Sequence, residues 1–126
     1  MTSVQKRLLF EDLEDFTELG EYFDQPLIFG STGMQARFNF GLLTSSPKDI
    51  LVVDEGIGAG DQFFQVKAEV RLKKLYSEAS ILLMASHSDD LILKFCNRAI
   101  WMENGEIRKD GPAETVLTSY KESVHA

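Results

Sequence analysis

The run of residues 50–53, Ile-Leu-Val-Val, constrains the fold most, because it is followed at once by Asp54 and Glu55. Four apolar residues in a row predict a strand that is buried on both faces, as in a parallel sheet. Ligands of such sheets bind at the carboxyl ends of the strands, where these two carboxylates stand. Successive side chains leave a strand on opposite sides, so one carboxylate can face a metal while the other faces a water.

The same residues also fit a simpler interpretation. A strand that merely meets solvent can end in Asp-Glu and continue into a turn, and residues 56–60 contain three glycines. The rest of the chain has to decide between a site and a turn.

Composition limits the classes of protein to which the chain can belong. With 126 residues, of which 44% are hydrophobic, it has the size and core material of one domain. A net charge of −7, with no run of Lys or Arg longer than two, argues against binding to nucleic acid or to an anionic membrane. The single cysteine, Cys96, cannot form an internal disulfide, and its apolar surroundings in the sequence predict a small core residue. No segment approaches the roughly 20 apolar residues of a membrane span, so we expect a soluble, cytoplasmic chain without membrane insertion.

Hydrophobic periodicity and turn signals predict an α/β fold with a parallel sheet and a final antiparallel hairpin. We expect a helical lobe over residues 1–46 and a second domain over residues 47–126. The expected elements are helices at 6–21, 34–43, 61–77, 89–95 and 112–122, and strands at 50–54, 80–85, 98–103 and 106–109, with an Asn104-Gly105 turn between the last two strands.

Two further stretches carry polar groups that bear on function. Ser31 or Thr32, in the loop before the helix at 34–43, is expected to cap that helix, and a helix start of this kind can bind an anion. His87 follows the strand at 80–85 and is expected at the same sheet edge as Asp54 and Glu55. Taken singly, each stretch is also typical of an ordinary cap or surface residue.

Together these stretches resemble the second half of an ATP-binding-cassette (ABC) nucleotide-binding domain. Residues 30–34, Gly-Ser-Thr-Gly-Met, match the signature loop, and residues 35–37 continue its helix. Residues 50–54 match the Walker B strand, and Glu55 matches the catalytic glutamate. Residues 58–61 match the D-loop, and His87 matches the switch histidine. The variants within these motifs are similar to the subfamily that exports polysaccharides, namely O-antigen, capsule and teichoic acid. Thr32 and Met34 depart from the usual Leu-Ser-Gly-Gly-Gln signature, and Gly30 is expected to loosen the loop.

The resemblance implies a separate role for each of these residues. Asp54 holds Mg²⁺ directly or through water, Glu55 polarises the attacking water, and His87 reaches the γ-phosphate. The signature loop contacts ATP that is held by the opposite subunit of a head-to-tail dimer, through Ser31, Thr32, Gly33 and Met34. Asp61 lines the dimer contact. The implied partners are a second ABC ATPase subunit and a transmembrane permease, which holds the chain at the inner face of the plasma membrane.

One expected motif is missing. No G-x-x-x-x-G-K-[ST] phosphate loop occurs in the sequence. The expected fold is therefore a partial P-loop NTPase whose parallel sheet lacks the Walker A strand, with an open apolar edge that makes the chain marginal or dependent on a partner. Because the phosphate loop supplies most contacts to the β- and γ-phosphates, we expect the isolated chain neither to bind nor to hydrolyse ATP.

Two functions from different classes remain at this point. The first is the C-terminal part of a transporter ATPase, either cut from a longer chain or completed by a separate N-terminal piece. The alternative is a non-catalytic, truncated interaction protein that retains the ABC dimer or transporter contact. The presence of Asp54, Glu55 and His87 favours the first. A cassette ATPase of the DNA-repair type is disfavoured by the acidic charge.

Overall fold

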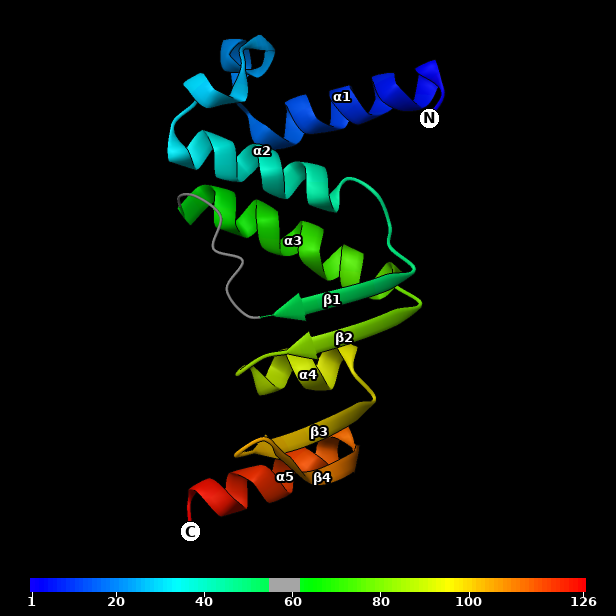
Figure 1. The fold of residues 1–126 in the computed structure, drawn as a ribbon, viewed down its shortest axis with the longest axis vertical. Coiled ribbons are helices and arrows are strands. Elements are labelled where there is room, and N and C mark those ends of the chain that lie inside the picture. Colours follow the sequence, from blue (N-terminus) through cyan, green and yellow to red (C-terminus); the bar gives the residue numbers. More distant parts are fainter. Residues whose placement is uncertain (55–61) are drawn as a thin grey trace. The chain divides into compact units, whose positions relative to one another are not determined.

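The computed structural model describes residues 1–54 and 62–126, which form two compact units (Figure 1). The helical unit contains α1 (Ser3–Thr17), η1 (Gly20–Asp24), η2 (Leu27–Phe29), α2 (Thr32–Thr44) and α3 (Gln62–Glu78). The α/β unit contains β1 (Ile50–Asp54), β2 (Ile81–Ala85), α4 (Asp89–Phe95), β3 (Arg98–Glu103), β4 (Glu106–Pro112) and α5 (Ala113–Val124). The α/β class and the order of the elements are as predicted. The helical unit includes α3, which follows β1 in the sequence, as well as α1 and α2. The division of the chain into two domains at residue 46 remains a prediction.

The first helix is shorter at its C-terminal end than its apolar periodicity predicts. A capping box starts α1, in which the Thr2 hydroxyl accepts from the Gln5 amide and the Gln5 side chain accepts from the Thr2 amide. The helix ends at Thr17 because Glu18 has a φ of 52° and Gly20 a φ of 57°, which an α-helix cannot accommodate. The predicted extension to residue 21 is therefore wrong, and the chain continues in a 3₁₀ turn, η1.

Three phenylalanine rings, one from each long helix, form the core of the helical unit. Phe16 of α1 lies 5.8 Å from Phe40 of α2 and 5.1 Å from Phe64 of α3, measured between ring centroids. Ala68 and Leu72 of α3 complete the cluster. Contacts between aromatic rings at these distances add to the gain from burial alone. The cluster therefore holds α2, the helix that starts at the predicted signature loop, against α1 and α3.

A glycine allows the close approach of α1 and α2. A Cβ atom added at Gly41 would lie 3.1 Å from the side chains of both Leu13 and Phe16, and 3.3 Å from that of Thr17. Because these three residues are themselves buried, they have little room to move. Close packing of α1 on α2 therefore requires glycine at position 41, a requirement that the sequence alone does not reveal.

Arg71 joins the three long helices through its guanidinium group. Its Nη atoms donate to both carboxylate oxygens of Asp12 in α1, at 2.9 and 2.5 Å. Its Nε donates to the Thr44 hydroxyl and one Nη to the Gly41 carbonyl, both in α2, at 2.7 and 3.1 Å. The group also lies 4.2 Å from the centre of the Phe16 ring. A planar, bidentate arrangement of this kind suits arginine and no other residue.

The strands of the α/β unit form two separate ladders among the described residues. β1 and β2 pair in parallel, with Ile50 opposite Ile81 and Asp54 opposite Ala85. β3 and β4 pair as an antiparallel hairpin, and α5 packs on both strands. The hairpin turn is as predicted, because Asn104 and Gly105 both have positive φ, at 52° and 79°.

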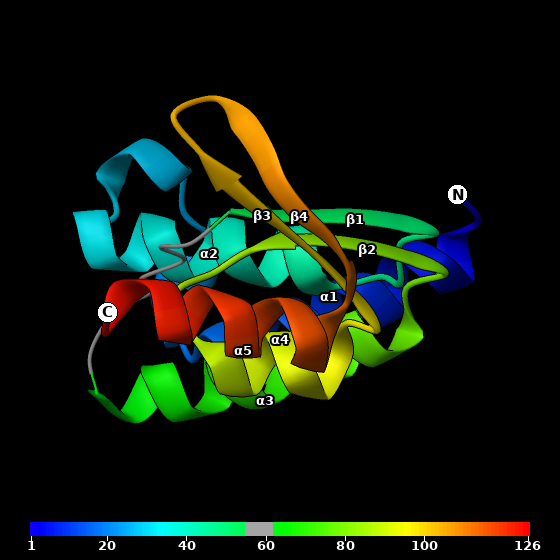
Figure 2. The same ribbon diagram turned by 90° about the horizontal axis from the view of Figure 1, so that it is seen from below.

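The prediction that β1 and β2 are buried on both faces is wrong. Side chains along each strand alternate between exposed and covered, so that Val53 is buried while Val52 is exposed. The α/β unit has helices on one side of its strands only: α4 and α5 lie together on one side of both ladders (Figure 2). A run of four apolar residues therefore marks two apolar faces, but among the described residues only one face of each strand is covered.

We predict that filling the space at Gly41 destabilises the helical unit. Gly41→Leu forces apart buried side chains, which should lower the free energy of unfolding by about 1–3 kcal/mol relative to Gly33→Leu. Gly33 is the matched control because it also lies in α2 but has only the Ser31 hydroxyl, at 3.9 Å, near its position. Urea unfolding followed by circular dichroism measures the difference. Equal stability of the two variants would contradict the packing account.

Removing the Arg71 guanidinium should destabilise the unit more than removing an exposed one. The Arg71 side chain is 16% exposed and makes four hydrogen bonds, whereas Arg7 is 72% exposed and pairs with Glu11 at 3.7 Å. We expect Arg71→Met to lower the free energy of unfolding by about 1.5–3 kcal/mol. Arg7→Met should change it by less than about 0.5 kcal/mol. Similar losses in the two variants would show that Arg71 does not join the helices.

Candidate functional site

The parallel ladder brings two of the expected catalytic residues to one edge. Asp54 is the last residue of β1 and pairs in register with Ala85, the last residue of β2. His87 follows two residues after Ala85, before Ser88 caps α4 by accepting from the Leu91 amide at 3.4 Å. Both Asp54 and His87 are exposed. The structure thus confirms the predicted placement of Asp54 and His87 at the carboxyl edge of one parallel ladder.

Glu55 and Asp61 lie outside the described residues, together with the rest of the predicted D-loop. The expected contact between Glu55 and His87, and the expected position of Asp61 in a dimer contact, remain predictions.

The chemistry of the described residues fits a magnesium ion held by few protein ligands. The Asp54 carboxylate is exposed at the end of β1, and carboxylate oxygen is a ligand that Mg²⁺ prefers. Among residues 1–54 and 62–126, no three His, Cys, Asp or Glu side chains lie close enough together to bind a metal ion. Mg²⁺ characteristically uses one or two carboxylates, waters and substrate phosphates, so a single Asp54 suffices on the protein side.

The predicted signature loop leads into α2, as expected. Ser31, and not Thr32, is the N-cap, since its hydroxyl accepts from the Met34 amide at 3.2 Å. Thr32 and Gly33 occupy the first turn of α2 and are exposed, while Met34 is half-buried. Amides in the first turn of an α-helix have no intrahelical acceptor and carry the positive end of the helix dipole. The start of α2 therefore offers backbone donors to an anion.

Gly30 is held in place by hydrogen bonds, contrary to the expectation that it loosens the loop. Its amide donates to the Leu27 carbonyl at 3.1 Å, and its carbonyl accepts from the Gln35 side-chain amide at 3.1 Å. An added Cβ atom would lie 3.3 Å from the Leu27 carbonyl oxygen. The close turn between η2 and α2 thus favours glycine for lack of space.

Cys96 is half-buried at the end of α4, and burial raises the pKa of its thiol. A raised pKa disfavours the reactive thiolate at neutral pH. Cys96 is only partly covered and lies outside the buried core, so the prediction of a small core residue is not confirmed.

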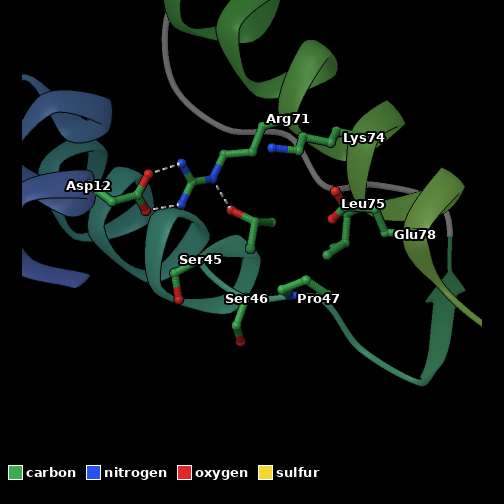
Figure 3. Close-up of a pocket in the computed structure, with 9 residues that line it drawn as sticks. Asp12, Ser45, Ser46, Pro47, Arg71, Lys74, Leu75 and Glu78 are labelled. Carbon is green, nitrogen blue, oxygen red and sulfur yellow. Dashed lines mark hydrogen bonds and ion pairs between the residues drawn. The ribbon is translucent and has the colours of Figure 1, made fainter. Parts of the chain in front are cut away.

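A hollow lies beside Arg71 in the helical unit (Figure 3). It has a volume of about 180 Å³ and is lined by Asp12, Arg71, Lys74 and Glu78, among others. The Arg71 guanidinium points at Asp12 and has its donors engaged within the helical unit (Figure 3). Sequence reasoning missed this cluster, although an arginine on the apolar side of an amphipathic helix signals a charged partner.

None of the helices over residues 1–54 and 62–126 combines the length and the apolar character needed to cross a membrane.

Comparisons with known proteins connect this geometry to a family. No protein-family model matches the chain. The O-antigen export system ATP-binding protein RfbB of Klebsiella pneumoniae is 35% identical over 121 residues, which are 96% of this chain and 48% of that protein. The teichoic acids export ATP-binding protein TagH of Lactococcus lactis is 32% identical over 124 residues, 98% of this chain and 27% of that protein. The chain is therefore similar, over nearly its whole length, to one part of these O-antigen and teichoic acid export ATP-binding proteins. It thus spans less than half the length of these curated relatives.

Solved structures support the same fold. An ATP-binding subunit of an ABC transporter matches 96% of this chain and 50% of its own, with a TM-score of 0.67 at 14% identity. A dimeric ATP-binding cassette bound to ADP and Pi matches 90% of this chain and 49% of its own, with a TM-score of 0.56 at 22% identity. The predicted partial ABC ATPase fold is therefore confirmed.

We predict that Ser31 stabilises the start of α2 through its hydroxyl. Ser31→Ala removes the oxygen that accepts from Met34 and should lower the free energy of unfolding by about 0.5–2 kcal/mol. Ser31→Asp keeps an acceptor at this position and should retain most of the stability. Chemical unfolding of both variants tests this prediction, and equal losses would show that the cap does not matter.

Proposed function

We propose that this chain is the C-terminal part of the ATP-binding and ATP-hydrolysing subunit of an ABC exporter for a polysaccharide or a lipid-linked glycan. The similarity to O-antigen and teichoic acid export proteins over at least 96% of the chain carries the proposal. The placement of Asp54 and His87 at one ladder edge supports it, because ATP hydrolysis needs a metal ligand and a phosphate-contacting group close together.

Three residues have separate roles in ATP hydrolysis. Asp54 holds Mg²⁺ directly or through a water. Glu55 polarises the water that attacks the γ-phosphate, and His87 donates to the γ-phosphate from the neighbouring strand end. The metal neutralises charge on the phosphates when bound. Phosphoryl transfer depends mainly on such positioning and charge stabilisation, so few protein groups are required.

The signature loop acts on nucleotide held by a second ABC ATPase subunit. Thr32 and Gly33 offer first-turn amides to its γ-phosphate, and Ser31 and Met34 set the geometry of that turn through the cap hydrogen bond. Two subunits pack head to tail, with Asp61 at their contact. A transmembrane permease holds the pair at the inner face of the plasma membrane.

The isolated chain neither binds nor hydrolyses ATP under this proposal. It has no phosphate-loop motif, and that loop makes most contacts to the β- and γ-phosphates. Isothermal titration calorimetry of the isolated chain should therefore show no ATP binding in the micromolar range. Micromolar binding would contradict this part of the proposal.

The catalytic role of Glu55 can be tested in a chimera. The unmatched N-terminal half of the Klebsiella RfbB protein is joined to this chain, and ATP hydrolysis is measured. We expect Glu55→Gln to reduce the turnover rate at least 100-fold, an effect in the range for loss of a catalytic base. Glu114→Gln is the matched control, because Glu114 is exposed on α5, and it should leave the rate unchanged. A chimera that binds ATP but hydrolyses it no faster than its Glu55→Gln variant would instead favour a non-catalytic interaction protein.

A further inference from the structure

His87 lies on a short turn that is tied to the start of α4. The Ser88 amide donates to the Ser86 hydroxyl at 3.0 Å, and this hydrogen bond spans His87. Ser88 also begins α4, because its hydroxyl accepts from the Leu91 amide at 3.4 Å and its carbonyl accepts from the Ile92 amide at 3.2 Å. The backbone of His87 therefore moves with the first turn of α4.

α4 depends on its neighbours for its position. With seven residues it is too short to be stable as an isolated helix. α5 lies beside it (Figure 2) and contacts it at both ends. Past the C-terminal end of α4, the Asn97 carbonyl accepts from the Ala113 amide of α5 at 3.1 Å. At the N-terminal end, the Lys121 Nζ of α5 lies 2.8 Å from the Asp89 Oδ2, on the first residue of α4.

α5 is itself fixed on the β3–β4 hairpin. Three side chains on one face of α5 are buried, namely Ala113, Val116 and Leu117. Tyr120 meets Trp101 of β3 edge to face, with ring centroids 5.6 Å apart. Lys121 directly follows Tyr120, so its ammonium group extends from a backbone that the hairpin holds in place.

The ion pair between Lys121 and Asp89 suits a role in geometry better than a role in stability. The two side chains are 55% and 31% exposed, and pairs with such exposure contribute little to the free energy of unfolding. The hydrogen bond to Asp89, followed by the charges of Asp89 and Asp90, raises the pKa of Lys121, so the lysine stays protonated at neutral pH. The pair can therefore select one position for the start of a short helix.

We propose that Lys121 is a positioning residue for His87, an inference that rests on the function proposed above for this histidine. The ion pair with Asp89 holds the first turn of α4, and the hydrogen bonds of Ser88 pass that position on to His87. A displacement of about 1 Å at a reacting site can lower a rate by roughly 10²-fold. A contact that adds little to stability can thus have a large effect on turnover.

Amide hydrogen exchange in the full chain tests the first step, without ATP and without activity. In Lys121→Met we expect the amides of Ser88, Leu91 and Ile92 to exchange at least about threefold faster, because the start of α4 opens more often. Lys121→Arg keeps the charge and should restore the parent rates. Glu122→Gln is the matched control on the next residue of α5, which is exposed, and it should leave these rates unchanged.

The amides of β1 show whether the effect is local. Their exchange rates should be the same in Lys121→Met and in the parent chain. Unchanged exchange at Ser88, Leu91 and Ile92 in Lys121→Met would overturn the proposal, and so would equally faster exchange throughout β1 and α4.

Turnover of the RfbB chimera tests the second step. We expect Lys121→Met to lower the rate of ATP hydrolysis about fivefold to tenfold, Lys121→Arg to restore it, and Glu122→Gln to leave it unchanged. If Lys121 acts through His87, Lys121→Met should cause no further loss in a His87→Ala background. An equal loss in both backgrounds, or no loss in the parent chimera, would overturn the positioning role.

The two measurements separate this proposal from the proposed function. An inactive chimera, combined with faster exchange at the start of α4 in Lys121→Met, would reject the ATPase and keep the link from Lys121 to the His87 turn. An active chimera whose rate does not respond to Lys121→Met would keep the ATPase and reject the positioning role.

Discussion

The parallel pairing of β1 with β2 is the interaction on which the site depends. Asp54 and His87 are more than 30 residues apart in the chain, and the register that sets Asp54 opposite Ala85 brings their strand ends to one edge. A shift by one residue would turn every side chain of β1 to the other face and move Asp54 away from its neighbours. The helical unit has a separate role. Its three-ring core and the hydrogen bonds of Arg71 hold α2, whose first turn carries the predicted signature residues.

Much of this organisation could be predicted from local sequence signals. Ser31, one of the two residues expected to cap α2, does so, and Asn104-Gly105 forms the expected hairpin turn. These features depend on a few neighbouring residues, so a single sequence contains enough information to predict them. The order of motifs similarly predicted the family, since four short motifs in sequence order are far more specific than any one of them.

The remaining features depend on contacts between distant residues. The need for glycine at position 41 comes from the side chains of Leu13 and Phe16, which belong to another helix. Arg71 donates a hydrogen bond to Asp12, which lies 59 positions away in the sequence. The run at residues 50–53 indicated apolar character on both faces of β1 but not whether each face is covered. That difference arises from which elements surround the strand, and it is why the prediction of full burial failed.

The central claim is that Asp54 and His87 belong to one nucleotide site that a second polypeptide half completes. A crystal structure of the RfbB chimera with Mg²⁺ and a non-hydrolysable ATP analogue tests it most directly. The account predicts that Asp54 contacts the metal directly, at about 2.1 Å, or through one water. It also predicts that a ring nitrogen of His87 lies within about 3.2 Å of a γ-phosphate oxygen. A bound nucleotide whose metal and γ-phosphate lie away from both side chains would contradict it.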